Sequence, residues 1–431
     1  MTHFKQAREA IATALQQDEA LIDRAVLIDD IFGKLRVVAW FAADVLPDAE
    51  AELREVLATA SGPFWSGDLW VANGAAAADL ELYETAWNEA DEITPRFRRS
   101  SRRRTRGFWL EAPSEPAWPL PDEGGAAPII AFYSFKGGVG RTTALSSFAI
   151  LRARRGERVA VLDLDLDAPG VGLLLGPGEI SQPSPWGVVD YLLEAPLLEQ
   201  VDLKDYYHVC AREALTGAGE ILVFPSGRLE SDYLTTLARV DLEPPHPGRQ
   251  HPLLRLLEQV RDELRPDWIL LDCRAGLSEA SGFALSGLAH LTVLLGTTSE
   301  QSWEGLRLLL DRLGAERIRR SAPQSECVIV QAMVPEDAAS GQLAREHFAA
   351  RAEEEFERAY YAEDPTDQEE DAYWYMRDMD TGDAPHVPVA ISYEPKLAFL
   401  RSIEDALPVF LESEYGALET RISDRFEKEG A

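Results

Sequence analysis

The chain has 431 residues, of which 46% are hydrophobic, and its formal net charge is −32 at pH 7. This length allows two or three domains, and the acidic balance argues against a protein that coats nucleic acid, because such proteins need a basic surface. The three cysteines are widely separated and indicate neither a disulfide framework nor a metal centre. The chain starts without the apolar core of a signal peptide and has no apolar run of transmembrane length, so we expect a cytoplasmic protein.

Residues 1–110 are predicted to form a small N-terminal domain, either helical or α+β. The spacing of apolar residues predicts two helices between Phe4 and about Phe32, a strand over Leu35–Phe41, helices over Pro47–Ala60 and Ala75–Glu92, and a strand or aromatic turn over Phe64–Val71. These elements precede every motif that suggests chemistry.

An arginine-rich run, Arg96–Arg106, lies near the end of this domain and holds seven arginines in eleven positions. Such a run either contacts nucleic acid or an anionic surface, or pairs with acidic side chains of the same protein. The negative charge of the chain favours the second interpretation. Residues 111–127, with four prolines and a double glycine, then predict an extended linker between two domains.

The stretch Pro128–Thr143 reads PIIAFYSFKGGVGRTT and predicts a phosphate-binding loop. Its apolar start is typical of a buried strand, and Ala144–Arg152 has helical spacing. Gly137, Gly138 and Gly140 allow successive backbone N–H groups to converge on an anion at the N-terminus of that helix.

Charged and hydroxyl side chains flank these glycines. Lys136 precedes them, Arg141 follows them, and Thr142 supplies a hydroxyl where phosphate-binding loops place a ligand to magnesium. The loop is therefore predicted to bind a nucleoside triphosphate with Mg²⁺.

Two further predicted strands end in carboxylates. Arg158–Asp165 is apolar up to Asp163 and Asp165, with Asp167 just after, and a later apolar run ends in Asp272. Carboxylates at the carboxyl ends of parallel strands lie where ligands bind in open α/β sheets.

Strands continue to alternate with helices to about Phe410, which predicts a mainly parallel, doubly wound α/β domain over residues 128–431, with helices on both faces. An insertion at about 336–383 has sixteen acidic and four basic residues and predicts a helix over Leu343–Tyr361 followed by a mobile acidic loop. The terminal stretch Tyr415–Phe426 predicts a docked helix, because its polar face is not basic as that of a membrane-binding helix would be.

The string KGGVGRTT resembles the deviant Walker A loop, KGGxGK[ST], of the ParA/MinD-type partition and positioning ATPases. Arg141 stands where that loop has its second lysine, and Phe135 stands at the first Walker glycine. The KGGVGR form is associated with multi-gene bacterial signalling and conflict systems. The resemblance covers Pro128 to about Phe410, and its later motifs are similar to an IDxD motif at Asp163 and Asp165 and to a Walker B motif at Asp272.

The resemblance implies a P-loop ATPase site for ATP and Mg²⁺. In such a site Lys136 reaches across a nucleotide-sandwich homodimer, Arg141 supplies charge at the phosphates, and Asp165 orients the attacking water. The implied nucleotide contacts are Lys136, Gly137, Gly138, Val139, Gly140, Arg141, Thr142, Thr143, Gly276 and Gln331, and the implied metal shell is Thr142, Asp163 and Asp272. Two assignments stay open: Asp165 and Asp167 have the same spacing as Asp163 and Asp165, and Gln331 is either an adenine contact or a plain strand-end residue.

The leading hypothesis is an ATP-dependent dimerisation switch whose N-terminal domain transmits the nucleotide state to a protein partner in a bacterial defence or signalling system. Because arginine and lysine are not interchangeable at a tightly packed phosphate site, hydrolysis is expected to be slow, and the alternative is a non-hydrolysing nucleotide sensor. A third hypothesis is a partition-type ATPase that binds DNA non-specifically, which only the run Arg96–Arg106 supports.

Overall fold

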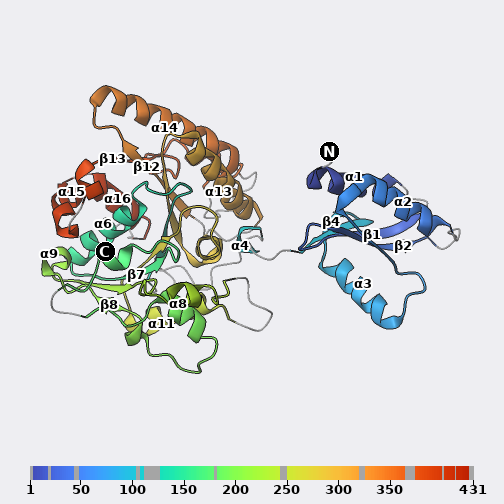
Figure 1. Cartoon of the computed structure of the whole chain (residues 1–431). Helices are drawn as coiled ribbons and strands as arrows, with labels where there is room; N and C mark the ends of the chain where they lie inside the picture. Colours follow the sequence, from blue (N-terminus) through green and yellow to red (C-terminus); the bar gives the residue numbers. More distant parts are fainter. Residues whose placement is uncertain are drawn as a thin grey trace. The chain divides into compact units, whose positions relative to one another are not determined.

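The computed structural model of the chain describes residues 3–17, 21–42, 48–102, 107–110, 127–178, 182–242, 250–319, 326–364, 374–399, 402–412 and 414–426. The chain divides into two compact units, Met1–Thr105 and Arg106–Ala431 (Figure 1). Each unit has its own sheet and its own hydrophobic core.

The N-terminal unit is a five-stranded sheet with helices on both faces (Figure 1). The strand order is β3-β2-β1-β5-β4, with antiparallel β1/β2 and β4/β5 pairs and parallel β1/β5 and β2/β3 pairs. Helices α1 and α2 pack on the face that carries Leu27 and Val37, and α3 packs on the face that carries Val26 and Val38. The elements are α1 (Phe4–Gln17), β1 (Ile22–Asp29), β2 (Leu35–Phe41), α2 (Ala49–Ser61), β3 (Trp65–Val71), α3 (Ala77–Glu89), β4 (Asp91–Thr94) and β5 (Phe97–Ser101).

The second helix predicted before Phe32 is wrong, because Ile22–Asp29 forms strand β1. Ala25 and Leu27 face α1 and α2, whereas Val26 packs toward α3. A strand that is buried on both faces is apolar at nearly every position, so its residues also satisfy a helical spacing. The other predicted elements of this unit are observed as α1, β2, α2, β3 and α3.

The described part of the arginine run includes strand β5. Arg98 Nη2 donates to Glu92 Oε2 over 3.1 Å, and its Nη1 donates to the carbonyl oxygen of Trp87 over 2.9 Å. The Arg98 guanidinium also lies 4.5 Å from the centre of the Trp87 ring. Arg98 is therefore paired inside the unit, as the second interpretation of the run expects. Residues 103–106 of the run lie outside the described residues.

The second unit confirms the predicted doubly wound α/β fold. Its eight strands have the order β13-β12-β11-β6-β10-β7-β9-β8, and every pair is parallel except β8/β9. The strands are β6 (Ile129–Tyr133), β7 (Arg158–Leu164), β8 (His208–Val209), β9 (Glu220–Phe224), β10 (Trp268–Cys273), β11 (Leu291–Gly296), β12 (Glu326–Val334) and β13 (Val389–Ser392).

Two groups of helices cover the two faces of this sheet and enclose separate cores (Figure 1). One face is covered by α8 (Val188–Glu194), α11 (Pro252–Gln259), α12 (Glu279–Phe283), α13 (Glu300–Arg319) and α14 (Ala338–Ala359). The other is covered by α6 (Arg141–Arg154), α9 (Glu213–Thr216), α15 (Leu407–Glu412) and α16 (Glu414–Ser423). All five residues of β6 are buried, so the strand before the phosphate loop runs through the middle of the unit.

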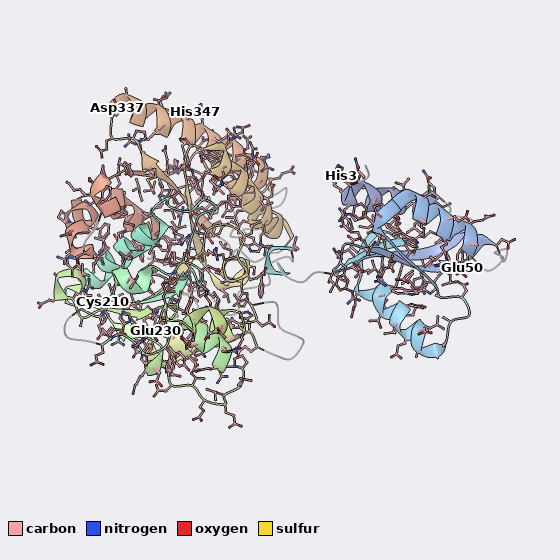
Figure 2. The ribbon with its side chains drawn as sticks, viewed as in Figure 1. His3, Glu50, Cys210, Glu230, Asp337 and His347 are labelled. Atoms are coloured by element: carbon pink, nitrogen blue, oxygen red, sulfur yellow. The ribbon has the colours of Figure 1, made fainter. Side chains whose placement is uncertain are left out.

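Two predicted segments of the C-terminal part are observed. Helix α14 begins after Asp337, whose side chain accepts a hydrogen bond from the backbone N–H of Ser340 (Figure 2). Residues 365–373 of the acidic insertion lie outside the described residues. Helix α16 docks through Tyr415, Leu418 and Ile422, as predicted. Within the described ranges, no helix is both long enough and apolar enough to cross a membrane.

Helix α4 (Gly107–Leu110) belongs to the second unit, so the units divide a few residues before the boundary expected at residue 110. The indole Nε1 of Trp109 donates to the carbonyl oxygen of Ser278 over 2.6 Å, and the ring lies 6.0 Å from that of Tyr133. The expected linker follows α4, and residues 111–126 lie outside the described residues.

Candidate functional site

The candidate site lies at the carboxyl ends of three adjacent strands, β6, β10 and β7. The phosphate loop connects β6 to α6, Asp272 lies near the end of β10, and Asp163 lies near the end of β7, with Asp165 and Asp167 just after that strand. Because the three strands are parallel neighbours, their ends meet at one edge of the sheet. The fold thereby brings together motifs that are far apart in sequence.

The phosphate loop has the backbone that its glycines predict. Gly138 and Gly140 have φ values of 75° and 87°, in the left-handed region that only glycine adopts at little cost. Gly140 is also the N-cap of α6. Lys136, Gly137 and Gly138 are exposed, so the tip of the loop is open to solvent.

The start of α6 anchors the loop in the unit. Val139 is buried, Thr142 and Thr143 are half-buried, and Arg141 is only 8% exposed. An exposed glycine-rich tip followed directly by the N-terminus of α6 is an arrangement that favours an anion.

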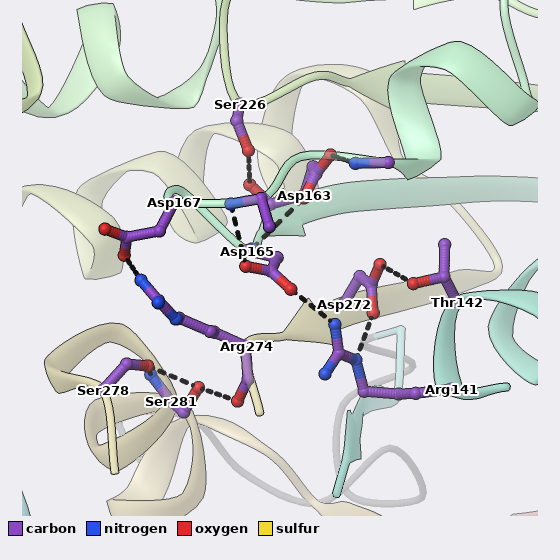
Figure 3. A network of polar contacts seen from close by, with 12 residues as sticks. Arg141, Thr142, Asp163, Asp165, Asp167, Ser226, Asp272, Arg274, Ser278 and Ser281 are labelled. Carbon is purple, nitrogen blue, oxygen red and sulfur yellow. Dashed lines mark hydrogen bonds and ion pairs between the residues drawn. The ribbon is translucent and has the colours of Figure 1, made fainter. Parts of the chain in front are cut away.

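The Arg141 guanidinium is held between two carboxylates (Figure 3). Its Nε donates to Asp272 Oδ1 over 2.8 Å, and its Nη2 donates to Asp165 Oδ2 over 2.7 Å. The hydroxyl of Thr142 donates to the remaining oxygen of Asp272, Oδ2, over 2.7 Å. One buried cation and one hydroxyl therefore satisfy both oxygens of Asp272.

Burial and charge determine the ionisation of this network. Burial alone would lower the pKa of Arg141, but Asp272 and Asp165 outweigh it and hold the pKa above its usual value. Burial raises the pKa of Asp272, although its bonds to Arg141 and Thr142 favour the charged form. Burial, followed by the nearby Asp272 charge, raises the pKa of Asp163 to about 7. Asp163, Asp165 and Asp272 thus outnumber the Arg141 guanidinium that lies among them.

The three acidic residues at the end of β7 and just after it have three different partners. Asp163 accepts hydrogen bonds from the backbone N–H groups of Asp165 and Gly170 over 3.2 and 3.1 Å. Asp165 binds Arg141, and Asp167 forms an ion pair with Arg274. Asp165 is therefore the only one of these three that contacts the residue at the start of α6. Asp163 also lines a cavity of about 620 Å³ beside the site.

Gly276 lies in the turn that follows β10 and has φ 74°. Its N–H donates to the carbonyl oxygen of Ser134 over 3.3 Å, and its carbonyl oxygen accepts from the hydroxyl of Tyr133 over 3.1 Å. The turn after β10 is thereby tied to the strand end that leads into the phosphate loop.

Gln331 is not brought into this network. It lies within β12, which continues to Val334 instead of ending at Gln331, two strands away from β6, and it is 1% exposed. Its Nε2 donates to the carbonyl oxygen of Ala344 over 2.9 Å, and its Oε1 has no hydrogen-bond donor among the residues that the structure describes. An adenine contact by Gln331 remains a prediction.

The structure adds three residues that the sequence analysis did not single out. Ser226 donates its hydroxyl to the carbonyl oxygen of Asp163 over 2.9 Å, and Arg274 pairs with Asp167 (Figure 3). Gly305 of α13 leaves room for Phe135, since a Cβ there would overlap the phenyl ring. Only Arg274 carried a sequence signal, because it follows Asp272 by two positions.

The parallel sheet, the glycine loop at the N-terminus of α6 and the carboxylates on the adjacent strands define a nucleotide-binding protein of the P-loop class. Residues 130–350, just over half of the chain, match the model of the CobQ/CobB/MinD/ParA nucleotide binding domain. The chain belongs to this family.

Known relatives cover only part of the chain. It is 26% identical to an ATP-binding protein of Methanocaldococcus jannaschii over 194 residues, which are 44% of this chain and 62% of that protein. It is 25% identical to the septum site-determining protein MinD of Synechocystis over 174 residues, 40% of this chain and 54% of MinD. The chain thus spans less than two thirds of the length of these relatives. A solved ParA family ATPase from Chlorobium tepidum covers 69% of this chain and 99% of its own, with 15% identity and a TM-score of 0.45.

Proposed function

We propose that the chain is an ATP-binding switch that hydrolyses ATP slowly, dimerises with nucleotide and regulates a protein partner in a bacterial defence or signalling system. The convergence of Arg141, Thr142, Asp165 and Asp272 beside the phosphate loop carries the proposal. Phosphoryl transfer depends mainly on charge held in position, and these side chains supply it. Membership of the ParA/MinD nucleotide-binding family and the ATP-binding relative support ATP as the nucleotide.

The residues beside the loop fit Mg²⁺. Thr142 Oγ1 and Asp272 Oδ2 lie 2.7 Å apart, and a hydroxyl with a carboxylate suits Mg²⁺ that keeps phosphate and water oxygens as its other ligands. Among the described residues, no three His, Cys, Asp or Glu side chains are grouped to hold a metal alone, which favours Mg²⁺ that arrives with phosphates. Bound Mg²⁺ would neutralise phosphate charge. Asp163 would act indirectly, because backbone N–H groups occupy its oxygens.

We base the proposed dimer on the different environments of the two basic residues of the loop, Lys136 and Arg141. Lys136 is exposed at the tip, whereas Arg141 is buried against acidic partners. An exposed lysine can reach phosphates bound by a second copy, so Lys136 is assigned to the partner's nucleotide and Arg141 to its own.

Light scattering with ATP and Mg²⁺ tests this assignment. We expect a dimer for the wild type and for Lys204→Ala, a matched change of an exposed lysine in the same unit, and a monomer for Lys136→Ala. A wild type that stays monomeric, or a Lys136→Ala variant that dimerises as readily, refutes the dimer.

A non-hydrolysing sensor is the second candidate, and the buried Arg141 favours it. The Arg141 guanidinium is hydrogen-bonded to Asp165, the residue assigned to orient water. Carboxylates hold a planar guanidinium more firmly than they would hold a lysine ammonium. Phosphate release measured beside nucleotide affinity separates the two candidates. Tight nucleotide binding by the wild type, with no more phosphate release than Asp165→Ala shows, would establish the sensor.

The protein partner is assigned to the N-terminal unit, since the family match begins only at residue 130. Nucleic-acid binding through Arg96–Arg106 is less favoured, because Arg98 is paired with Glu92. A salt-dependent mobility shift that is lost on replacing Arg102, Arg103 and Arg104 would establish it.

A further inference from the structure

The short helix α4 docks on α12 through two aromatic side chains. The rings of Phe108 and Phe283 stack with centroids 4.2 Å apart, and Trp109 Nε1 donates to the carbonyl oxygen of Ser278 over 2.6 Å. Ser278 is the N-cap of α12. A helix of four residues makes few contacts of its own, so these side chains determine where α4 lies.

Gly282 makes this close approach possible. A Cβ at Gly282 would lie within 3.0 Å of three atoms of the Trp109 indole, the nearest being Nε1 at 2.7 Å. Gly282 lies inside α12 and has no positive φ, so its backbone conformation does not require glycine. The glycine at this position is therefore explained by the indole packed against it.

Trp109 also reaches the turn that follows the Walker B strand. Its ring packs 6.0 Å from Tyr133, whose hydroxyl donates to the carbonyl oxygen of Gly276 over 3.1 Å. The backbone N–H of Ser278 donates to the same carbonyl oxygen over 3.1 Å. Trp109 thus contacts both hydrogen-bond partners of one carbonyl group, that of Gly276.

Helix α4 lies between the N-terminal unit and strand β6 in sequence, but at unequal distances from them. Gly107 follows the N-terminal unit by one residue, whereas sixteen residues separate Leu110 from Ala127. In sequence, α4 is therefore much nearer to the N-terminal unit than to β6.

We propose that α4 is a read-out element of the nucleotide switch, in which Trp109 is a positioning residue that couples the Gly276–Ser278 turn to the N-terminal unit. The proposal rests on the proposed nucleotide binding and adds the route by which the nucleotide state leaves the site. With α4 docked, the Gly276 N–H donates to Ser134, so it is not directed at a γ-phosphate. A γ-phosphate that recruits this N–H moves the turn and loosens α4. By linkage, loosening α4 strengthens binding of a triphosphate.

Fluorine NMR of the full chain labelled with 5-fluorotryptophan tests the coupling. The Trp109 signal is assigned by its loss in Trp109→Phe, and Trp268 serves as an internal reference because it lies at the other end of β10 and donates to Glu157. We expect Mg²⁺ with the non-hydrolysable analogue AMPPNP to shift the Trp109 signal and to leave Trp268 unchanged, with ADP having a smaller effect.

Gly282→Ala provides the second measurement, with Gly416→Ala as its matched control, since a Cβ at Gly416 meets nothing within 4 Å. We expect Gly282→Ala to shift the Trp109 signal without nucleotide and to raise the AMPPNP to ADP affinity ratio roughly fivefold or more, the lower end of typical coupling. Gly416→Ala should leave the ratio unchanged. A purely structural α4 would alter stability but not this ratio.

The outcomes separate the two proposals. If calorimetry detects AMPPNP binding but the Trp109 signal and the affinity ratio do not respond, the read-out role of α4 is overturned and the switch stands. If the wild type binds neither AMPPNP nor ADP, the proposed function fails, and the read-out role fails with it.

Discussion

Nε of Arg141 lies 2.8 Å from Oδ1 of Asp272, so the arginine at the start of α6 is bound to the carboxylate near the end of β10. Both side chains are buried, and removal of one partner of a buried ion pair leaves an uncompensated charge. We expect Arg141→Ala to lower the free energy of unfolding by about 3 to 5 kcal/mol in denaturant titrations. Arg158→Ala, which removes the exposed pair with Glu220, should cost at most about 1 kcal/mol. Similar losses for the two variants would contradict a structural role for Arg141.

We expect Arg141→Lys to lower the stability of the protein and to raise its rate of ATP turnover. A lysine ammonium is a point charge and cannot span Asp165 and Asp272 as the guanidinium does. We expect a less stable protein that releases phosphate several-fold faster at saturating ATP and Mg²⁺, because Asp165 is freed to orient water. Adding Asp165→Ala should abolish the gain. Turnover that stays the same or falls in Arg141→Lys argues that arginine itself promotes the reaction.

Thr142→Ala and Thr143→Ala should differ in their response to Mg²⁺. Of the two threonines, Thr142 is the one whose hydroxyl donates to Asp272 in the described structure, which places that hydroxyl with the carboxylate assigned to the metal. Titration of ATP with and without Mg²⁺ should show that Thr142→Ala loses the gain in affinity that Mg²⁺ provides, whereas Thr143→Ala weakens binding equally in both conditions. Equal Mg²⁺ dependence in the two variants would remove Thr142 from the metal shell.

The buried Asp163 should make the protein less stable as pH rises from about 4 to 7. Burial and the Asp272 charge raise its folded-state pKa to about 7, while the unfolded chain releases the proton near 3.8. Between these values the folded state binds more protons, so the free energy of unfolding falls with rising pH, by up to about 1.4 kcal/mol per unit, and levels off above pH 7. Denaturant titrations of Asp163→Asn should show a flatter profile. A profile parallel to that of the wild type would remove Asp163 as the cause.

Gly305→Ala should destabilise the second unit through Phe135. A Cβ at Gly305 would overlap the phenyl ring, and overpacking of this kind costs about 1 to 3 kcal/mol. In a Phe135→Gly background, which also removes the Phe135 Cβ that would lie 2.4 Å from the new Cβ, the same change should be neutral or stabilising, because alanine is a better helix former than glycine by roughly 1 kcal/mol. Thermal unfolding of the four variants of this cycle measures the coupling. Additive effects would show that Phe135 and Gly305 do not compete for space.

Local patterns in the sequence are sufficient to predict most of the strands and helices of the second unit. Strands β6, β7 and β10 are short apolar runs between turn residues, and each was recognised because burial on both faces leaves few polar positions. The same property makes β1 ambiguous, because its apolar residues also fit a helix and the local sequence does not reveal the helices that cover its two faces. Helix α4 has no local signal in the sequence, because its partners, Ser278 and Phe283, lie far along the chain.

By itself the sequence determined the phosphate loop, since glycines next to a lysine, an arginine and a threonine act through backbone freedom and local chemistry. It also determined that carboxylates lie at the ends of two further apolar strands. Only the tertiary structure decided that Arg141 binds Asp165 and Asp272, which are 24 and 131 positions away, and that Asp163, Asp165 and Asp167 have different partners. The physical reason is that strand order determines which strand ends meet, and ion pairs form between side chains that the sheet brings together.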